Sequence, residues 1–450
     1  MGPTSCMLFV GLQLLLPHLQ HAGLCCSLAA ICGFLKALQA QYLPNLYHNR
    51  MHAALVAHFS VLLARSSNLY ATLSCRLGTP AELLLASAPS LQTVAAGGSS
   101  APHAHHNGAL PPSGLPSSKT CNDSQSQEET LLLPSCSLGT QTEAHATGGH
   151  RRAVIEDEIV ICIAALGHDV AHPGLNNAFL VSTNQSLALV YNDNAVLENF
   201  HAYKTFKTLS DTADIDGGIL KGLSVSGYRQ LRRQVIELIL STDMAQHFPI
   251  LSSFRARNAS QTFSVASNED DKWMLAKLFI KAGDIGHSTL AWEQHYIWAC
   301  RVNEEFYTQG DVEEQLGLVI SPLCDRRKAA EMPAAQCGFL EYIVLPLVVE
   351  IRSCLEQQLS QQQQQQALCS ASSLVEPTCT GLSLMDGIIG HANYNLRCWK
   401  SLANTPSPSP ATTPTDSSSE PLRAATERGS SLTGTGRHAA GAGTVVQQTQ

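Results

Sequence analysis

The chain has 450 residues, of which 44% are hydrophobic and 14% are charged, whereas an ordinary soluble domain has about 25% charged residues. Its 28 Lys and Arg against 36 Asp and Glu give a formal net charge of -8, which argues against nucleic acid as a partner. The 15 cysteines are scattered without a Cys-x-x-Cys pair, which disfavours a disulfide framework and indicates a reducing, cytoplasmic compartment.

Residues 1–30 form an apolar N-terminal segment. Residues 6–16 and 23–38 are two apolar runs, and Pro17 and the polar residues after it separate them. Neither run has the roughly 20 consecutive apolar residues of a membrane-spanning helix, and no basic residue precedes them as in a secretory signal. We therefore expect buried helix here. Membrane association is the alternative, without a clear transmembrane segment to support it.

Composition divides the rest of the chain. Helical hydrophobic patterns over residues 24–74 and 151–358 flank a stretch at about 75–150 that is rich in Ser, Gly, Pro, Ala and His. That stretch cannot bury a core, so we predict a disordered insertion. A glutamine run at 361–366 is expected to interrupt the pattern before a short helix at 388–402, and a Pro/Ser/Thr/Gly tail follows. No segment alternates like a strand, so the prediction is an all-α fold.

Two pairs of histidines are spaced four residues apart: His48 with His52, and His168 with His172. On a helix, each pair would share one face and could present metal ligands, although one such pair is weak evidence because this spacing arises by chance. Asp169 ends a buried apolar run, and so does Asp284, and an ionised carboxylate there is costly unless it is paired or metal-bound. Such an oxygen-and-nitrogen site suits Zn, Mg, Mn or Fe.

Seven short motifs follow one another along the helical regions. They are YHNRMHAA from Tyr47, HDVAHPGLNNAF from His168, YNDNAVLEN from Tyr191, AGDI from Ala282, EEFYTQGD from Glu304, ISPLCD from Ile320 and QCGF from Gln336. In this order they resemble the catalytic domain of class I 3′,5′-cyclic nucleotide phosphodiesterases. Any one motif alone would be unspecific.

The resemblance implies a compact, multi-helix catalytic fold with a two-metal site at the floor of a deep pocket. The domain would cover residues 31–402, interrupted at about 75–150 and by a glutamine-rich stretch at about 357–372, with a disordered tail at 403–450. The family has several helices before the Tyr-His-Asn motif. Because only 46 residues precede Tyr47, we expect an N-terminally short domain.

The resemblance also implies a ligand set. The first metal, usually Zn²⁺, would be held by His52, His168, Asp169 and Asp284. Asp169 would bridge to a second metal, usually Mg²⁺ with Mn²⁺ as an alternative, and His172 and Glu198 would orient metal-bound water and the ligand. A hydroxide bridging the two metals would attack phosphorus, and His48, at the position of the family's general acid, would protonate the departing 3′ oxygen.

Substrate binding falls, by the same resemblance, to Tyr47, Asn177, His287, Gln336 and Phe339. The amide of Gln336 can face a purine either way round, and Phe339 can stack on the base. His287 and His295 stand where cAMP-selective members carry Asn and Tyr, so the choice between cAMP and cGMP is left open.

The expected function is therefore hydrolysis of cAMP, cGMP or both to nucleoside 5′-monophosphates, which ends cyclic nucleotide signalling. Two alternatives stay open: an inactive or truncated relative that binds nucleotide without turnover, and a different His/Asp metallophosphohydrolase. The sequence does not indicate an oligomeric state.

Overall fold

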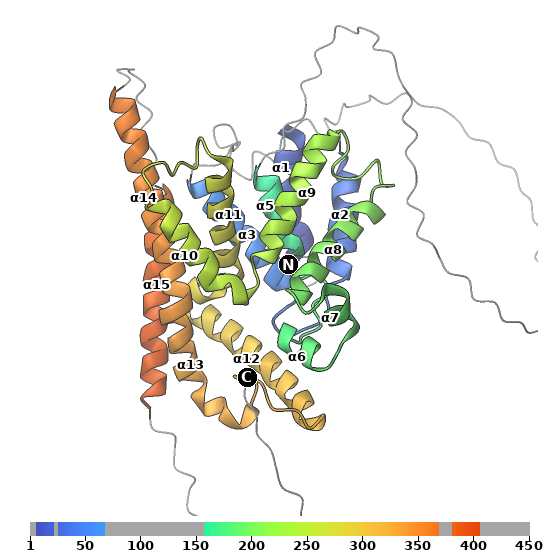
Figure 1. Cartoon of the computed structure of the whole chain (residues 1–450), viewed down its shortest axis with the longest axis vertical. Coiled ribbons are helices and arrows are strands. Elements are labelled where there is room, and N and C mark those ends of the chain that lie inside the picture. The colour runs from blue at the N-terminus through green and yellow to red at the C-terminus, as the bar shows by residue number, and fades with distance from the viewer. Residues whose placement is uncertain (1–5, 22–25, 68–156, 369–379, 406–450) are drawn as a thin grey trace, which may run out of the picture. The chain divides into compact units, whose positions relative to one another are not determined.

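The computed structural model describes residues 6–21, 26–67, 157–368 and 380–405 (Figure 1). The predicted insertion at about 75–150 lies outside these residues, and so does the predicted tail at 403–450 from residue 406 onward; α15 includes Ala403. All regular structure in the described part is helical, so the all-α prediction is confirmed. The α-helices are α1 (Cys6–His21), α2 (Leu28–Ala40), α3 (Arg50–Ser67), α5 (Asp157–Gly167), α6 (Asn177–Ser182), α7 (Ser186–Tyr191), α8 (Val196–Asp211), α9 (Val225–Leu240), α10 (His247–Asn258), α11 (Glu269–Asp284), α12 (Trp292–Gln315), α13 (Met332–Phe339), α14 (Leu345–Leu368) and α15 (Thr380–Ala403). Shorter helical turns are η1 (Met244–Gln246), η2 (Gly286–Thr289), η3 (Arg326–Glu331) and η4 (Leu340–Val344).

Helix α3 packs against both α5 and α11, and these three helices position the functional side chains. The approach of α11 to α3 depends on Gly283, because a Cβ at this position would lie 2.2 Å from the Ser60 hydroxyl oxygen. The close packing brings Asp284, the last residue of α11, next to His52 in the first turn of α3.

Helix α5 is the centre of the core. Every one of its residues is buried, as expected for a helix that is apolar nearly all round. Its last carbonyls are bonded by side chains from other helices: the Tyr42 hydroxyl donates to Leu166 at 2.8 Å, and the Thr205 hydroxyl donates to Gly167 at 3.2 Å. The chain then leaves the helix and places His168 in the interior.

The prediction that His48 and His52 share a helix face is wrong. Helix α3 begins at Arg50, so His48 lies in the bend before it. The reason is the side chain of Asn49, whose oxygen accepts the backbone N–H groups of Met51 at 2.8 Å and His52 at 3.3 Å. This N-cap starts the helix after His48.

The same prediction is wrong for His168 and His172. Helix α5 ends at Gly167, and both histidines lie in the turn that follows. Ala171 in this turn has a φ of 63°, in the left-handed region, so the backbone cannot continue as a right-handed helix. Four-residue spacing therefore brings the two imidazoles near the site through a turn rather than through a helix face.

The glutamine run does not interrupt the helical pattern. Helix α14 continues through residues 361–366 to Leu368, which is consistent with the good helix propensity of glutamine. Helix α15 starts at Thr380, earlier than the expected helix at 388–402, and runs alongside α14 (Figure 1).

The N-terminal apolar segment contributes to the core. Helix α1 continues through Pro17 and packs against α3 and α5, with Met7, Leu15 and Leu19 fully buried. In the described part of the chain, one helical run, residues 326–361, is long and apolar enough to cross a membrane by length and composition. A core helix of a soluble protein meets the same criterion, and Leu340 of this run is buried in the hydrophobic core.

Candidate active site and metal centre

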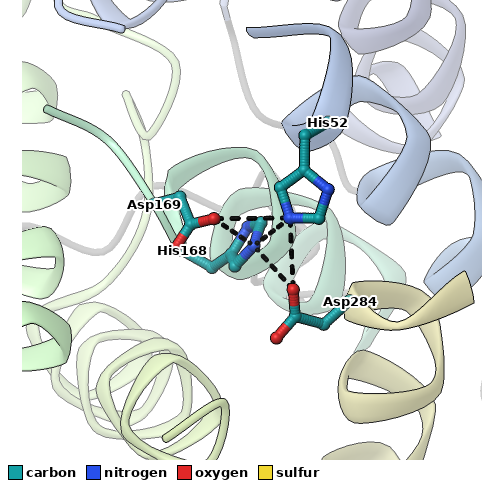
Figure 2. A group of neighbouring side chains, drawn as sticks. All are labelled: His52, His168, Asp169 and Asp284. Atoms are coloured by element: carbon teal, nitrogen blue, oxygen red, sulfur yellow. Dashed lines mark hydrogen bonds and ion pairs between the residues drawn. The ribbon is translucent and has the colours of Figure 1, made fainter. Parts of the chain in front are cut away.

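Two imidazoles and two carboxylates meet where α3, α5 and α11 converge (Figure 2). The residues are His52, His168, Asp169 and Asp284, and one ligand atom from each lies within 4.8 Å of all the others. Nε2 of His168 is 3.3 Å from Nε2 of His52, 3.1 Å from Oδ2 of Asp169 and 3.3 Å from Oδ1 of Asp284. Nε2 of His52 is 3.3 Å from Oδ2 of Asp169 and 3.2 Å from Oδ1 of Asp284.

This donor set fits a divalent cation. A tetrahedral zinc with ligand distances of about 2.0–2.2 Å places its ligand atoms about 3.3–3.6 Å apart, close to the separations seen here. The Nδ1–H of His168 donates to the Ala165 carbonyl at 2.8 Å, so the Nε2 lone pair points into the cluster. Nε2 of His52 lies 3.3 Å from this nitrogen, so if both are unprotonated a cation between them would relieve their repulsion.

The charge at the cluster is also consistent with a cation. Burial by itself would raise the pKa of Asp169 and of Asp284, but the adjacent imidazoles hold both well below their ordinary values. Asp284 ends α11, where the negative end of the helix dipole disfavours an anion. The site therefore keeps two carboxylates ionised in a buried, unfavourable position, as a metal centre requires.

A second feature beside the cluster is the pair His48 and Glu305. The Glu305 carboxylate accepts a hydrogen bond from Nδ1 of His48 at 2.5 Å. It also accepts hydrogen bonds from the backbone N–H groups of Tyr47 at 2.8 Å and His48 at 3.2 Å. Burial lowers the pKa of His48, but Glu305 and the cluster carboxylates outweigh it and raise that pKa above its ordinary value. The Glu305 carboxylate thus favours the protonated form of the His48 ring.

His172 and His201 complete the inner face. The ring of His172 stacks on that of His48 at 4.0 Å, and its Nδ1 accepts the Gly174 N–H at 3.0 Å, so in neutral His172 the proton is on Nε2. Nδ1 of His201 donates to the Val170 carbonyl at 2.8 Å, which leaves Nε2 as an acceptor 3.9 Å from Oδ1 of Asp169. These side chains could orient water around a second cation beside Asp169.

A cavity of about 420 Å³ opens over this face. Six of the sequence-predicted residues line it: His48, Asp169, His172, Asn177, Glu198 and Asp284. Five carboxylates also face it, namely Asp169, Glu198, Asp243, Asp284 and Glu305. An anionic ligand could not enter so acidic a cavity unless cations neutralised it.

Asn177 and Glu198 form one unit in the cavity wall. The Asn177 amide donates to the Glu198 carboxylate at 3.0 Å and accepts the Leu197 backbone N–H at 2.9 Å, so both ends of the amide are used. Burial raises the pKa of Glu198 to about 7, so this carboxyl titrates near neutrality.

The remaining predicted substrate-binding residues lie outside the lining of this cavity. Tyr47 packs its ring on His52 with centroids 4.6 Å apart, and His287 meets Tyr47 edge-on at 5.5 Å. Gln336 is 8% exposed on α13, and its side-chain oxygen makes no hydrogen bond within the described residues. Phe339 ends α13 and packs partly buried against the core.

Sequence reasoning assigned no role to Glu305, His201 or Lys281. The signal for Glu305 is present: Glu305, Gln309 and Glu313 recur every four residues on α12 and all are buried, so they form a polar stripe on an inward helix face. Nothing local distinguishes His201 or Lys281 from exposed polar residues, because only their tertiary neighbours define them.

Residues 154–366 match the family described as 3′5′-cyclic nucleotide phosphodiesterase. This part of the chain belongs to that family. The dual 3′,5′-cyclic-AMP and -GMP phosphodiesterase beta of Plasmodium falciparum is 45% identical over 194 residues, which cover 43% of this chain and 17% of that protein. The phosphodiesterase regA of Dictyostelium discoideum is 34% identical over 201 residues, or 45% of this chain and 25% of that protein.

Solved phosphodiesterase structures share the fold. The phosphodiesterase domain of a rhodopsin phosphodiesterase fusion from Salpingoeca rosetta superposes with a TM-score of 0.56 at 22% identity, covering 89% of this chain and 90% of that one. A second structure, LmjPDEB1 in complex with IBMX, gives a TM-score of 0.58 at 22% identity, covering 88% of this chain and 86% of that one.

The family match begins at residue 154, yet two histidines of the site, His48 and His52, precede it. His52 lies on α3, which packs against both α5 and α11, and His48 lies in the bend just before α3. Both residues precede the predicted insertion. The site is therefore assembled from residues on both sides of the predicted insertion.

Proposed function

We propose that this chain hydrolyses 3′,5′-cyclic nucleotides, cAMP, cGMP or both, to nucleoside 5′-monophosphates. The observation that carries the proposal is the placement of His48, hydrogen-bonded to Glu305, on the wall of the same acidic cavity that meets the two-histidine, two-carboxylate cluster. Dual and cGMP-specific enzymes are among the relatives, which supports this class of substrate.

The residues around the cluster suit a cyclic phosphodiester. When bound, divalent cations supply the positive charge that a phosphodiester anion needs and the Lewis acidity that makes water nucleophilic. His52, His168, Asp169 and Asp284 would hold the first, and Asp169 with its neighbours His172 and His201 would face the second. Zn²⁺ at the first position and Mg²⁺ or Mn²⁺ at the second are proposed from the donor types.

His48 would act as the general acid. Its Nδ1 is held by Glu305, so the proton available to a ligand is on Nε2. As the oxygen of a water molecule bonds to phosphorus, the bond from phosphorus to the 3′ oxygen breaks, and the 3′ oxygen takes this proton and departs as a hydroxyl group. Glu305 orients the ring and favours the imidazolium form before transfer.

A cytoplasmic location is proposed from the cysteine pattern alone. The enzyme would act on small cyclic nucleotides and end their signal.

The test is an assay of purified full chain with Mg²⁺ and Zn²⁺ against cAMP and cGMP, comparing Asp284→Asn with Asp386→Asn. Asp386 is an exposed carboxylate on α15 that pairs with Arg352, so its replacement controls for loss of charge. We expect Asp284→Asn to abolish hydrolysis and lose bound zinc, and Asp386→Asn to do neither. Binding without turnover by the wild type, or turnover of other phosphate esters only, would overturn the proposal.

A further inference from the structure

Helix α9 has three arginines on its outer face: Arg229, Arg232 and Arg233, which we call the arginine cluster. All three are exposed, and their spacing of three and four residues makes them neighbours on the helix surface. The only acidic residue of α9 is Glu237, and it pairs with Lys277 of α11 at 3.4 Å. The outer face of α9 is therefore basic in a chain whose formal net charge is -8.

The arginine cluster has no counter-charge in the described part of the chain, where no acidic side chain forms an ion pair with any of its three residues. The Arg232 guanidinium lies over the Phe206 ring of α8, 4.5 Å from its centroid, which holds this charge where α8 packs against α9 (Figure 1). Like charges three and four residues apart destabilise a helix. This cost is uncompensated by the described residues, and an external anion would offset it.

Two side chains beside the arginine cluster indicate which kind of anion fits. Val225 is 69% exposed and Tyr228 is 40% exposed. Each lies four residues before an arginine, Val225 before Arg229 and Tyr228 before Arg232, so apolar and basic groups alternate on one helix face. At a lipid surface, arginines reach the phosphates while tyrosine and aliphatic side chains contact the acyl boundary. Nucleic acid would use the charges but not the exposed valine.

The arginine cluster lies away from the cavity. Arg233 precedes Leu240, the last residue of α9, by seven residues, or about 10 Å along the helix axis. The cavity lining includes Thr242, beyond that end of the helix, and none of the three arginines. A surface could therefore contact the arginine cluster without filling the cavity.

We propose that the outer face of α9 docks the chain on an anionic lipid surface, with the arginine cluster contacting the head groups and Val225 and Tyr228 entering the interface. The cytoplasmic leaflet of a membrane has such a surface charge. Docking of this kind is reversible, depends on salt and needs no membrane-spanning helix. The proposal does not depend on the proposed function, because lipid binding requires neither metal nor nucleotide.

The test is co-sedimentation of the purified full chain with vesicles of phosphatidylcholine alone or with about one third phosphatidylserine. At about 0.1 M salt the chain should bind the mixed vesicles only, and about 0.5 M salt should release it. The triple variant Arg229→Gln/Arg232→Gln/Arg233→Gln should lower the partition coefficient about 100-fold, from a loss of about fivefold for each arginine.

The matched control is Arg255→Gln/Arg327→Gln/Arg352→Gln, which removes the same charge from other surface arginines. Each of these pairs with a carboxylate at 2.8 to 2.9 Å, so their charge is already balanced. The control should bind mixed vesicles as wild type does. Val225→Ser should weaken vesicle binding but leave binding to soluble polyglutamate unchanged.

Three outcomes would overturn the proposal. The first is a wild type that does not bind mixed vesicles, and the second is equal loss of binding in the triple variant and the control. The third is binding of the wild type to polyglutamate or double-stranded RNA but not to vesicles, which would assign the arginine cluster to another polyanion. If the triple variant loses its helical CD spectrum, Arg229→Gln alone should still weaken vesicle binding about fivefold, and an unchanged partition coefficient would count against the proposal. Failure to hydrolyse cyclic nucleotides would leave all of these readouts intact.

Discussion

Lys281 is a buried ammonium group whose removal gives a quantitative test of the structure. It is 3% exposed on α11, and its Nζ donates to the Ser241 carbonyl at 2.9 Å and more weakly to the Asp243 carbonyl at 3.4 Å. These bonds hold the turn between α9 and η1 that forms one wall of the cavity. Burial lowers the pKa of Lys281 to about 8, although Asp284 and Asp243 partly oppose the shift.

The magnitude follows from the two protonation equilibria. The ordinary lysine pKa is 10.5 and the folded value is about 8, and at about 1.36 kcal/mol for each pKa unit the difference amounts to about 3 kcal/mol. Below pH 8 both states carry the proton, so the folded state bears the full penalty. Between pH 8 and 10.5 only the unfolded state keeps the proton, so the contribution of Lys281 to stability rises with pH.

The assay is urea unfolding of wild type and Lys281→Met at pH 7 and at pH 10.5. Between these two pH values the free energy of unfolding of the variant should fall by about 3 kcal/mol relative to that of wild type, because only the wild type gains stability from the deprotonation of Lys281. Taking this difference removes the titration of cysteines and tyrosines, which both proteins share.

Lys277→Met is the matched control, since Lys277 lies one turn earlier on α11 and also reaches α9, through a partly exposed pair with Glu237 at 3.4 Å. Its relative stability should change by less than about 1 kcal/mol across the same range. If Lys281→Met tracks wild type at both pH values as closely as the control does, Lys281 is not a desolvated ammonium and the reasoning is wrong.

Four further predictions concern the site and its supports. In Glu305→Gln the amide cannot accept all three N–H hydrogen bonds, so kcat should fall about 10- to 100-fold. The pKa of His48 should drop as well, which moves the alkaline limb of the pH–rate profile to lower pH. An alkaline limb that does not move would contradict this prediction. Gly283→Ala should destabilise the fold by about 1–3 kcal/mol in thermal unfolding and should weaken zinc binding in a zinc titration. The control is Gly387→Ala, which should be neutral or stabilising because the space around Gly387 is open. Chelation of divalent ions should lower Tm, because Zn²⁺ at 100 times its Kd stabilises the folded state by about 2.7 kcal/mol, and a Tm insensitive to chelator and to added Zn²⁺ would argue against the metal centre. Replacing residues 70–154 with a short Gly/Ser linker should preserve fold and activity. The reason is that an ion pair of 2.7 Å, between Arg65 and Glu158, already joins the end of α3 to the start of α5. Loss of the helical CD spectrum would show that the segment is required.

Local patterns in the sequence were sufficient for the fold class. Apolar residues at helical spacing and the lack of strand alternation predicted an all-α domain, and the structure confirms it within its described residues. Local patterns were less reliable at the ends of helices. The N-cap at Asn49 and the termination at Gly167 decided where two histidine pairs lie, and they overrode the four-residue spacing.

The sequence by itself determined which residue types were available for chemistry. The motifs predicted a ligand set, because a family pattern is carried in order along the chain even across the predicted insertion. The structure places His52, His168, Asp169 and Asp284 within reach of one ion. Only tertiary structure decided which other side chains support them. Glu305 bonds to Tyr47 and His48, Lys281 bonds to Ser241, and Trp399 bonds to His295. Each partner is far away in the sequence. A hydrogen bond is set by distance and direction in space, and the packing of α3, α5, α11, α12 and α15 creates those relations where no local pattern records them.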